Sequence, residues 1–159
     1  TDFTPAGQDI RELLKESRHV ILFAATLGNE AEKLIRTRQR TDMGEALILD
    51  CCGSAAIENV CDNLCEDLAG ELGYLTDRFS PGYGDFPFAQ QPAFCRVLNV
   101  ERTIGVTLTP GGLMLPQKSV TALLGVADRP QPRRPAGCAV CSLFDTCAWR
   151  KEGNPCEKN

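Results

Sequence analysis

Long apolar runs are missing from this chain of 159 residues, and so are an excess of positive charge and a second histidine. No apolar stretch approaches the ~20 residues that a membrane-spanning helix needs, so we expect no membrane association. The formal net charge is −4, which argues against nucleic acid as the main partner. His19 is the single histidine, so a histidine ligand set for a metal is excluded and we assign His19 no role.

The first residues show no signal-peptide pattern, yet the chain carries nine cysteines. An odd number of cysteines cannot all pair as disulfides, and cysteines in a chain without a secretory signal more often serve metal or redox chemistry. We therefore expect a cytoplasmic protein. Internal repeats and low-complexity tracts are also missing.

Hydrophobic periodicity predicts the order of helices and strands. Helices are predicted over residues 7–18, 30–40, 42–72 and 90–98, with Asp42 capping the third. Strands are predicted over 19–25, 103–109 and 119–126, with a short return at 113–115. We expect Leu34 to face the core, and we count Met43 and Leu47 among the apolar positions of the long third helix. Because no regular βαβ repeat is present, we expect an α+β fold, with a small, largely antiparallel sheet and packed helices.

Composition divides the chain into three parts. Residues 1–128 form the predicted domain, and 129–137, rich in proline and arginine, read as a linker. Residues 138–159 form a cysteine-rich tail.

The tail has the strongest spacing signal. Cys138, Cys141, Cys147 and Cys156 are separated by two, five and eight residues. Four thiolates can hold one zinc ion, usually as paired short knuckles, or a [4Fe–4S] cluster, which accepts irregular spacing. The second pair is not a knuckle, so we favour the iron–sulfur cluster and keep zinc as the alternative; a disulfide pair or unligated thiols is the less favoured reading.

The other cysteines fit a structural role better. Cys61 and Cys65 are four residues apart on the predicted long helix, so they share a face. We expect these two, together with Cys51, Cys52 and Cys95, to be small buried hydrophobic residues. Glu58 lies in the same helix within a small, apolar stretch, and spacing alone places it on the exposed face.

Residues 78–87 hold two prolines, two glycines, an arginine, a carboxylate and three aromatic rings. The prolines fix φ and remove backbone donors, and the glycines permit positive φ and a close approach to the main chain. The segment therefore reads as a shaped loop, and such loops carry function when a scaffold holds them. An ordinary proline–glycine turn is the slightly favoured reading from these ten residues alone.

Three ordered motifs resemble one family. Arg78-Phe79-Ser80-Pro81-Gly82-Tyr83 is similar to the R-x-x-P-G-Y segment in the activation domain of cobalamin-dependent methionine synthase. The helix before it in that domain resembles Leu49-Asp50 and Gly53-Ser54-Ala55-Ala56-Ile57-Glu58, and a later hairpin resembles Ile104-Gly105-Val106-Thr107-Leu108-Thr109 and Met114-x-Pro116-x-Lys118-Ser119-Val120. The similarity covers residues 25 to 125 in the right order.

The resemblance implies a function. That domain binds S-adenosylmethionine and docks onto a cobalamin-binding module, where one electron and the methyl group restore methylcobalamin. By position, Glu58, Arg78, Ser80, Gly82 and Tyr83 would bind S-adenosylmethionine, Ser80 mainly through its backbone. The implied partners are the cobalamin-binding domain of a methionine synthase or another corrinoid protein, and an electron donor.

The chain departs from the family in its four-cysteine tail, and Arg129 to Arg134 replace an aromatic residue after the last strand. We expect an accessory component that reactivates a separate corrinoid methyltransferase, and we leave open whether it is itself an enzyme. Two alternatives remain: an iron–sulfur electron carrier that does not bind S-adenosylmethionine, and a zinc-stabilised interaction module.

Overall fold

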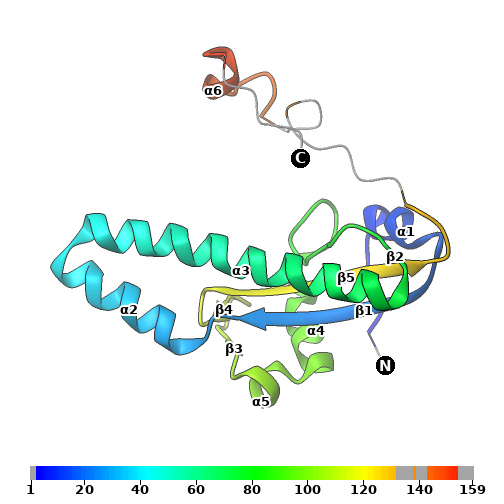
Figure 1. The fold of residues 1–159 in the computed structure, drawn as a ribbon, viewed down its shortest axis with the longest axis horizontal. Coiled ribbons are helices and arrows are strands. Elements are labelled where there is room, and N and C mark those ends of the chain that lie inside the picture. The colour runs from blue at the N-terminus through cyan, green and yellow to red at the C-terminus, as the bar shows by residue number, and fades with distance from the viewer. Residues whose placement is uncertain (1–2, 132–137, 139–142, 154–159) are drawn as a thin grey trace.

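The computed structural model describes residues 3–131, 138 and 143–153, and it has the expected α+β class (Figure 1). A three-stranded antiparallel sheet has the order β1 (Ser17–Thr26), β5 (Ser119–Ala127) and β2 (Tyr74–Leu75). A separate hairpin pairs β3 (Thr107–Leu108) with β4 (Met114–Leu115). The predicted small antiparallel sheet with packed helices is therefore confirmed at this level.

The central strand, β5, is covered on both faces. Its register with β1 pairs Leu22 with Leu123 and Thr26 with Ser119. Successive residues of a strand point to opposite faces, so Leu123 joins one hydrophobic cluster while Ala122 and Leu124 join the other. This explains why the segment reads as a nearly continuous apolar run.

Helices form a layer on each side of this sheet (Figure 1). On one side, α3 (Met43–Leu72) places Cys61 against Phe23 and Leu124. On the other, α1 (Gln8–Leu14) and α4 (Gln91–Leu98) supply Ile10 and Phe94, and the short η1 (Phe88–Gln90) leads into α4.

The long helix begins where the sequence predicts. The Asp42 side chain accepts a hydrogen bond from the Glu45 amide at 3.0 Å, which satisfies one of the unpaired N–H groups of the first turn. The helix ends before Gly73, whose φ of 94° favours glycine. With α2 (Gly28–Thr41), it forms a hairpin that extends past the end of β1 (Figure 1).

That extension leaves three apolar side chains exposed, and one of them, Leu34, was predicted to face the core. Met43 and Leu47 are 67% and 65% exposed, and Leu34 on α2 is 47% exposed. The helical period was correct, but the sheet does not reach this end of the hairpin. Ile35 and Ala46 are the buried residues between the two helices.

Two predicted boundaries were wrong. The first helix ends at Leu14, because Ser17 and Arg18 already belong to β1. Residues 103–109 are not one strand, since α5 (Val100–Ile104) occupies the start and ends at Gly105, which has a φ of 69°. Val100 and Val106 bury their side chains beside Cys95, and this packing outweighs the local alternation.

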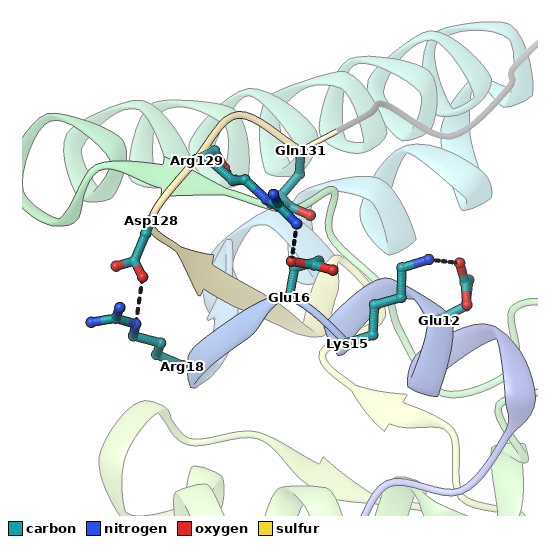
Figure 2. A network of polar contacts seen from close by, with 7 residues as sticks. All are labelled: Glu12, Lys15, Glu16, Arg18, Asp128, Arg129 and Gln131. Carbon is teal, nitrogen blue, oxygen red and sulfur yellow. Dashed lines mark hydrogen bonds and ion pairs between the residues drawn. The ribbon is translucent and has the colours of Figure 1, made fainter.

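Exposed ion pairs tie the end of the domain to its beginning (Figure 2). Arg129 pairs with Glu16, and Asp128 pairs with Arg18. At the end of α1, Lys15 pairs with Glu12. The first residue of the predicted linker is therefore held against the domain, whereas residues 132–137 lie outside the described part of the chain.

In the tail, the described residues include the short helix α6 (Ala148–Lys151). Among the described residues, no helix is both long enough and apolar enough to cross a bilayer.

Candidate functional site

The loop of residues 78–87 is fastened to the sheet at its start. Phe79 exchanges two backbone hydrogen bonds with Leu123 of β5, each 2.9 Å long. This isolated bridge pairs with β5, as β2 does, but it is too short to form a strand of its own. The loop therefore leaves the sheet at a defined point, directly after Phe79.

A carboxylate fastens the other end of the loop to α1. Asp85 accepts hydrogen bonds from the backbone N–H groups of Gln8 at 2.5 Å and Asp9 at 3.1 Å. These are N–H groups that a helix leaves without internal partners. Gly84 has a φ of 51°, and a Cβ there would clash with the Asp9 carboxylate. This contact explains the glycine beside Asp85.

Aromatic packing fills the interior of the loop. Phe86 is buried and stacks on Phe79 with ring centroids 6.3 Å apart. The Gly82 N–H donates to the Phe86 carbonyl at 2.8 Å, so the loop closes on itself. This segment is thus a fixed structure supported by the core, and the aromatic packing fits the reading as a proline–glycine turn as well as the reading as a functional loop.

Four of the five residues that the sequence singled out line one pocket of about 620 Å³. Glu58 comes from α3, and Arg78, Ser80 and Tyr83 come from the loop. Strand β5, the β3–β4 hairpin, Phe88 of η1 and Gln91 of α4 form the other walls. The volume falls within the range of about 300–1,000 Å³ that is common for small-molecule sites.

Arg78 joins the loop to α3 through two carboxylates. Its Nη2 lies 2.6 Å from Asp62 Oδ1 and 3.2 Å from Glu58 Oε2. The Arg78 side chain is only 23% exposed, while both acids are largely exposed. Two carboxylates and one guanidinium leave one excess negative charge, so this end of the pocket favours a cationic group. Glu58 is largely exposed, as its spacing predicts, and it also lines the pocket.

The second terminal nitrogen of Arg78 is less well satisfied. Nη1 is buried and has no hydrogen-bond partner among the described residues. The Cys61 thiol lies nearby: burial raises its pKa, and the charge of Arg78 opposes part of that rise. Cys61 is therefore a protonated, buried thiol that packs beside the guanidinium.

Gly82 does not line the pocket, although the sequence placed it there. It has a φ of 96°, and a Cβ at this position would lie 3.4 Å from the Phe88 ring. Gly112, in the β3–β4 turn, approaches the same ring, and a Cβ there would lie 3.2 Å from Cε1. Phe88 does line the pocket, so Gly82 acts by letting this ring pack between two turns.

The deep polar wall of the pocket was missed by the sequence reading. Gln91 is 2% exposed, and its Nε2 donates to the Thr121 hydroxyl at 2.9 Å. Both residues line the pocket. Their proximity depends on α4 lying across β5, and no local pattern around Gln91 signals that. Thr109 and Ser119 also line the pocket; they fall within the quoted hairpin motif but were not selected as site residues.

The cysteines outside the tail divide into two groups. Cys61 and Cys95 are buried, as predicted, and Cys65 is half-buried. Cys51 and Cys52 are exposed, which corrects the prediction that they are buried. They lie in the half of α3 that the sheet does not cover.

The metal centre predicted in the tail stays a prediction, because the structure describes only two of its four cysteines. Cys141 and Cys156 lie outside the described residues, whereas Cys138 and Cys147 are described. Within the described part of the chain, no three His, Cys, Asp or Glu side chains are grouped closely enough to hold a metal ion. Cys147 directly precedes α6, and its N–H donates to the Leu143 carbonyl at 2.7 Å.

Comparison with known proteins adds no assignment: a scan against protein-family models matches no family, and a search of the curated proteins finds no match.

Proposed function

We propose that this chain binds S-adenosylmethionine in the pocket beside the loop and serves the reductive reactivation of a corrinoid methyltransferase. One observation carries the proposal. The motif resemblance in the sequence points to Glu58, Arg78, Ser80 and Tyr83, and these residues come from two elements that are separate in the chain. All four line the same pocket of about 620 Å³.

The chemistry of the pocket supports this ligand. S-adenosylmethionine carries a sulfonium, an α-ammonium and a carboxylate next to an aromatic base. The excess negative charge of Glu58, Asp62 and Arg78 suits the cationic groups, and a guanidinium suits the carboxylate. Tyr83, which is 67% exposed, offers a ring face to the base or to the sulfonium.

Asp62 has a supporting role in this proposal. Because it lies closer to Arg78 than Glu58 does, it holds the guanidinium in place when Glu58 turns toward a ligand. Glu58 is then available for the ammonium or hydroxyl groups of the ligand. The sequence resemblance did not select Asp62.

The chain itself orients reactants and supplies no acid or base. In the proposed reaction the methyl group of S-adenosylmethionine passes to the cobalt of a partner protein, one electron is consumed by cob(II)alamin, and methylcobalamin and S-adenosylhomocysteine are produced. The four tail cysteines are proposed to hold a [4Fe–4S] cluster that relays this electron, with a structural zinc as the alternative. The cysteine spacing supports this proposed metal centre.

Calorimetric titration of the anaerobic full chain with S-adenosylmethionine tests the binding proposal. Arg78→Ala should weaken binding by about 1.5–3 kcal/mol, the range for a hydrogen bond to a charged group. Glu58→Gln should weaken it in the same direction, since size is kept and charge is lost. Glu71→Gln, an exposed acid on the same helix, is the matched control and should bind as the wild type does. Equal affinity for wild type, Arg78→Ala and Glu58→Gln would mean that S-adenosylmethionine does not bind in this pocket.

A further inference from the structure

Two of the quoted sequence motifs contain residues that the proposed function does not use. Asp50, Gly53 and Ser54 lie on α3, and Lys118 directly precedes β5. The structure brings these residues together, although Ser54 and Lys118 are 64 residues apart. The Lys118 ammonium donates to the Ser54 hydroxyl at 2.8 Å and lies 2.9 Å from Asp50 Oδ1. Lys118 therefore joins the segment before β5 to the long helix.

The Lys118 side chain fits closely against α3. It is only 12% exposed, and a charge that is so nearly removed from water requires a partner. The Ser54 hydroxyl donates its own hydrogen to the Asp50 carbonyl at 3.1 Å, which leaves its lone pairs for the ammonium. The stem of Lys118 crosses the helix at Gly53, where a Cβ would lie 3.3 Å from Cε. Glycine inside a helix is destabilising relative to alanine, and this close approach explains its presence.

Arg78 meets the same side of α3 in the same way. Four polar side chains recur at every fourth position and share one side of the helix: Asp50, Ser54, Glu58 and Asp62. We call them the α3 stripe. Lys118 pairs with its first two members, as Arg78 pairs with its last two. Each of two cations thus attaches a different part of the chain to one stripe.

Both of these parts of the chain form walls of the ligand pocket. Arg78 begins the loop wall, and Gln117 and Ser119, the neighbours of Lys118, line the pocket as well. The main chain around Lys118 is held at two points: the Gln117 N–H donates to Glu32 at 2.8 Å, and the Lys118 carbonyl accepts from the Leu27 N–H at 2.9 Å. The Lys118 side chain adds the connection to α3, the helix that carries Glu58.

We propose that Lys118 is a positioning residue for the ligand pocket. It does not line the pocket itself. It holds the wall at residues 117–119 against the α3 stripe, so that this wall keeps a fixed distance from Glu58 and Arg78 before a ligand arrives. A site that is ordered in advance loses less conformational freedom on binding. The role rests on the proposed function, because it concerns the affinity of the same pocket for S-adenosylmethionine.

Lys118→Met tests the role, because methionine keeps an apolar stem and removes the ammonium. Replacing a buried charge pair by an apolar group of similar size is often neutral for stability. In hydrogen exchange measured by NMR without ligand, the Leu27 and Gln117 amides should exchange at least about tenfold faster than in wild type. The Leu123 amide, which bonds to Phe79 in the sheet, should be unchanged. A loss of general stability would accelerate all three.

Calorimetric titration of the anaerobic full chain measures the effect on the pocket. Lys118→Met should bind S-adenosylmethionine about fivefold more weakly, since the wall must become ordered on binding. Asp50→Asn should weaken binding in the wild type and have no further effect in the Lys118→Met background, as expected for two residues that act through one contact. Lys33→Met removes an exposed ammonium that pairs with Glu30 on α2, and it should bind as wild type does.

The outcomes separate this role from the proposed function. If wild type binds S-adenosylmethionine and Lys118→Met binds it equally well, the positioning role is overturned and the proposed function stands. Unchanged exchange of the Leu27 and Gln117 amides in Lys118→Met would also overturn the role alone. A wild-type chain that does not bind S-adenosylmethionine would overturn the proposed function and this role together.

Discussion

Alanine substitutions at Gly112 and Gly105 distinguish an effect on the ligand pocket from an effect on stability, because both glycines have a positive φ and only Gly112 lies against a pocket residue. Gly112 has a φ of 84° and a Cβ there would lie 3.2 Å from Phe88 Cε1, whereas Gly105 has a φ of 69° and nothing within 4 Å. Replacing either by alanine forces a side chain into the left-handed region, at a cost of about 1–2 kcal/mol. For a chain of this size that loss lowers Tm by about 2–8 °C.

The difference between the two variants is the Phe88 ring. In Gly112→Ala the methyl group pushes this ring, which lines the pocket, and the ring must shift by a few tenths of an ångström. We therefore expect Gly112→Ala to bind S-adenosylmethionine more weakly than wild type, and Gly105→Ala to bind it normally. Thermal melts and calorimetric titrations of the three proteins measure both effects. If both variants lose stability equally and Gly112→Ala keeps full affinity, the argument that Phe88 shapes the site is refuted.

Three further results are expected. Asp42→Ala should lower the free energy of unfolding by about 1 kcal/mol in a urea titration, because the Glu45 amide loses its cap; no change would mean that the cap contributes nothing. Brief alkylation at neutral pH, mapped by mass spectrometry, should modify exposed Cys51 and Cys52 well before Cys61, whose pKa is raised by burial and whose thiolate fraction is correspondingly small; early labelling of Cys61 would contradict its burial. Anaerobic protein should be brown and lose its colour in Cys141→Ala, whereas colourless protein with about one zinc per chain would make the tail a structural zinc site.

Local chemistry made parts of this fold predictable. The Asp42 cap, the long helix ending before Gly73, and the buried strand at 119–127 depend on residues that are neighbours in sequence. Glu58 and Arg78 are twenty residues apart, and only the motif resemblance brought them together before the fold was known.

Other features depend on contacts that no short stretch contains. Leu34 was predicted from the helical period to face the core, but it is 47% exposed because the α2–α3 hairpin extends past the sheet. The pairing of Arg78 with Asp62 and the placement of Gln91 beside Thr121 arise from how α3 and α4 cross the sheet. Thr103 and Ile104 alternate as a strand does, yet they lie in α5 because the burial of Val100 and Val106 sets the local conformation.

The most direct measurement of the central claim is photo-cross-linking of the full anaerobic chain with methyl-labelled S-adenosylmethionine, followed by peptide mapping. The account predicts saturable labelling that unlabelled ligand competes away, and that falls on peptides that line the pocket, namely those with Glu58, residues 78–91 or residues 109–122. Labelling confined to the tail, or no saturable labelling at all, would contradict the account.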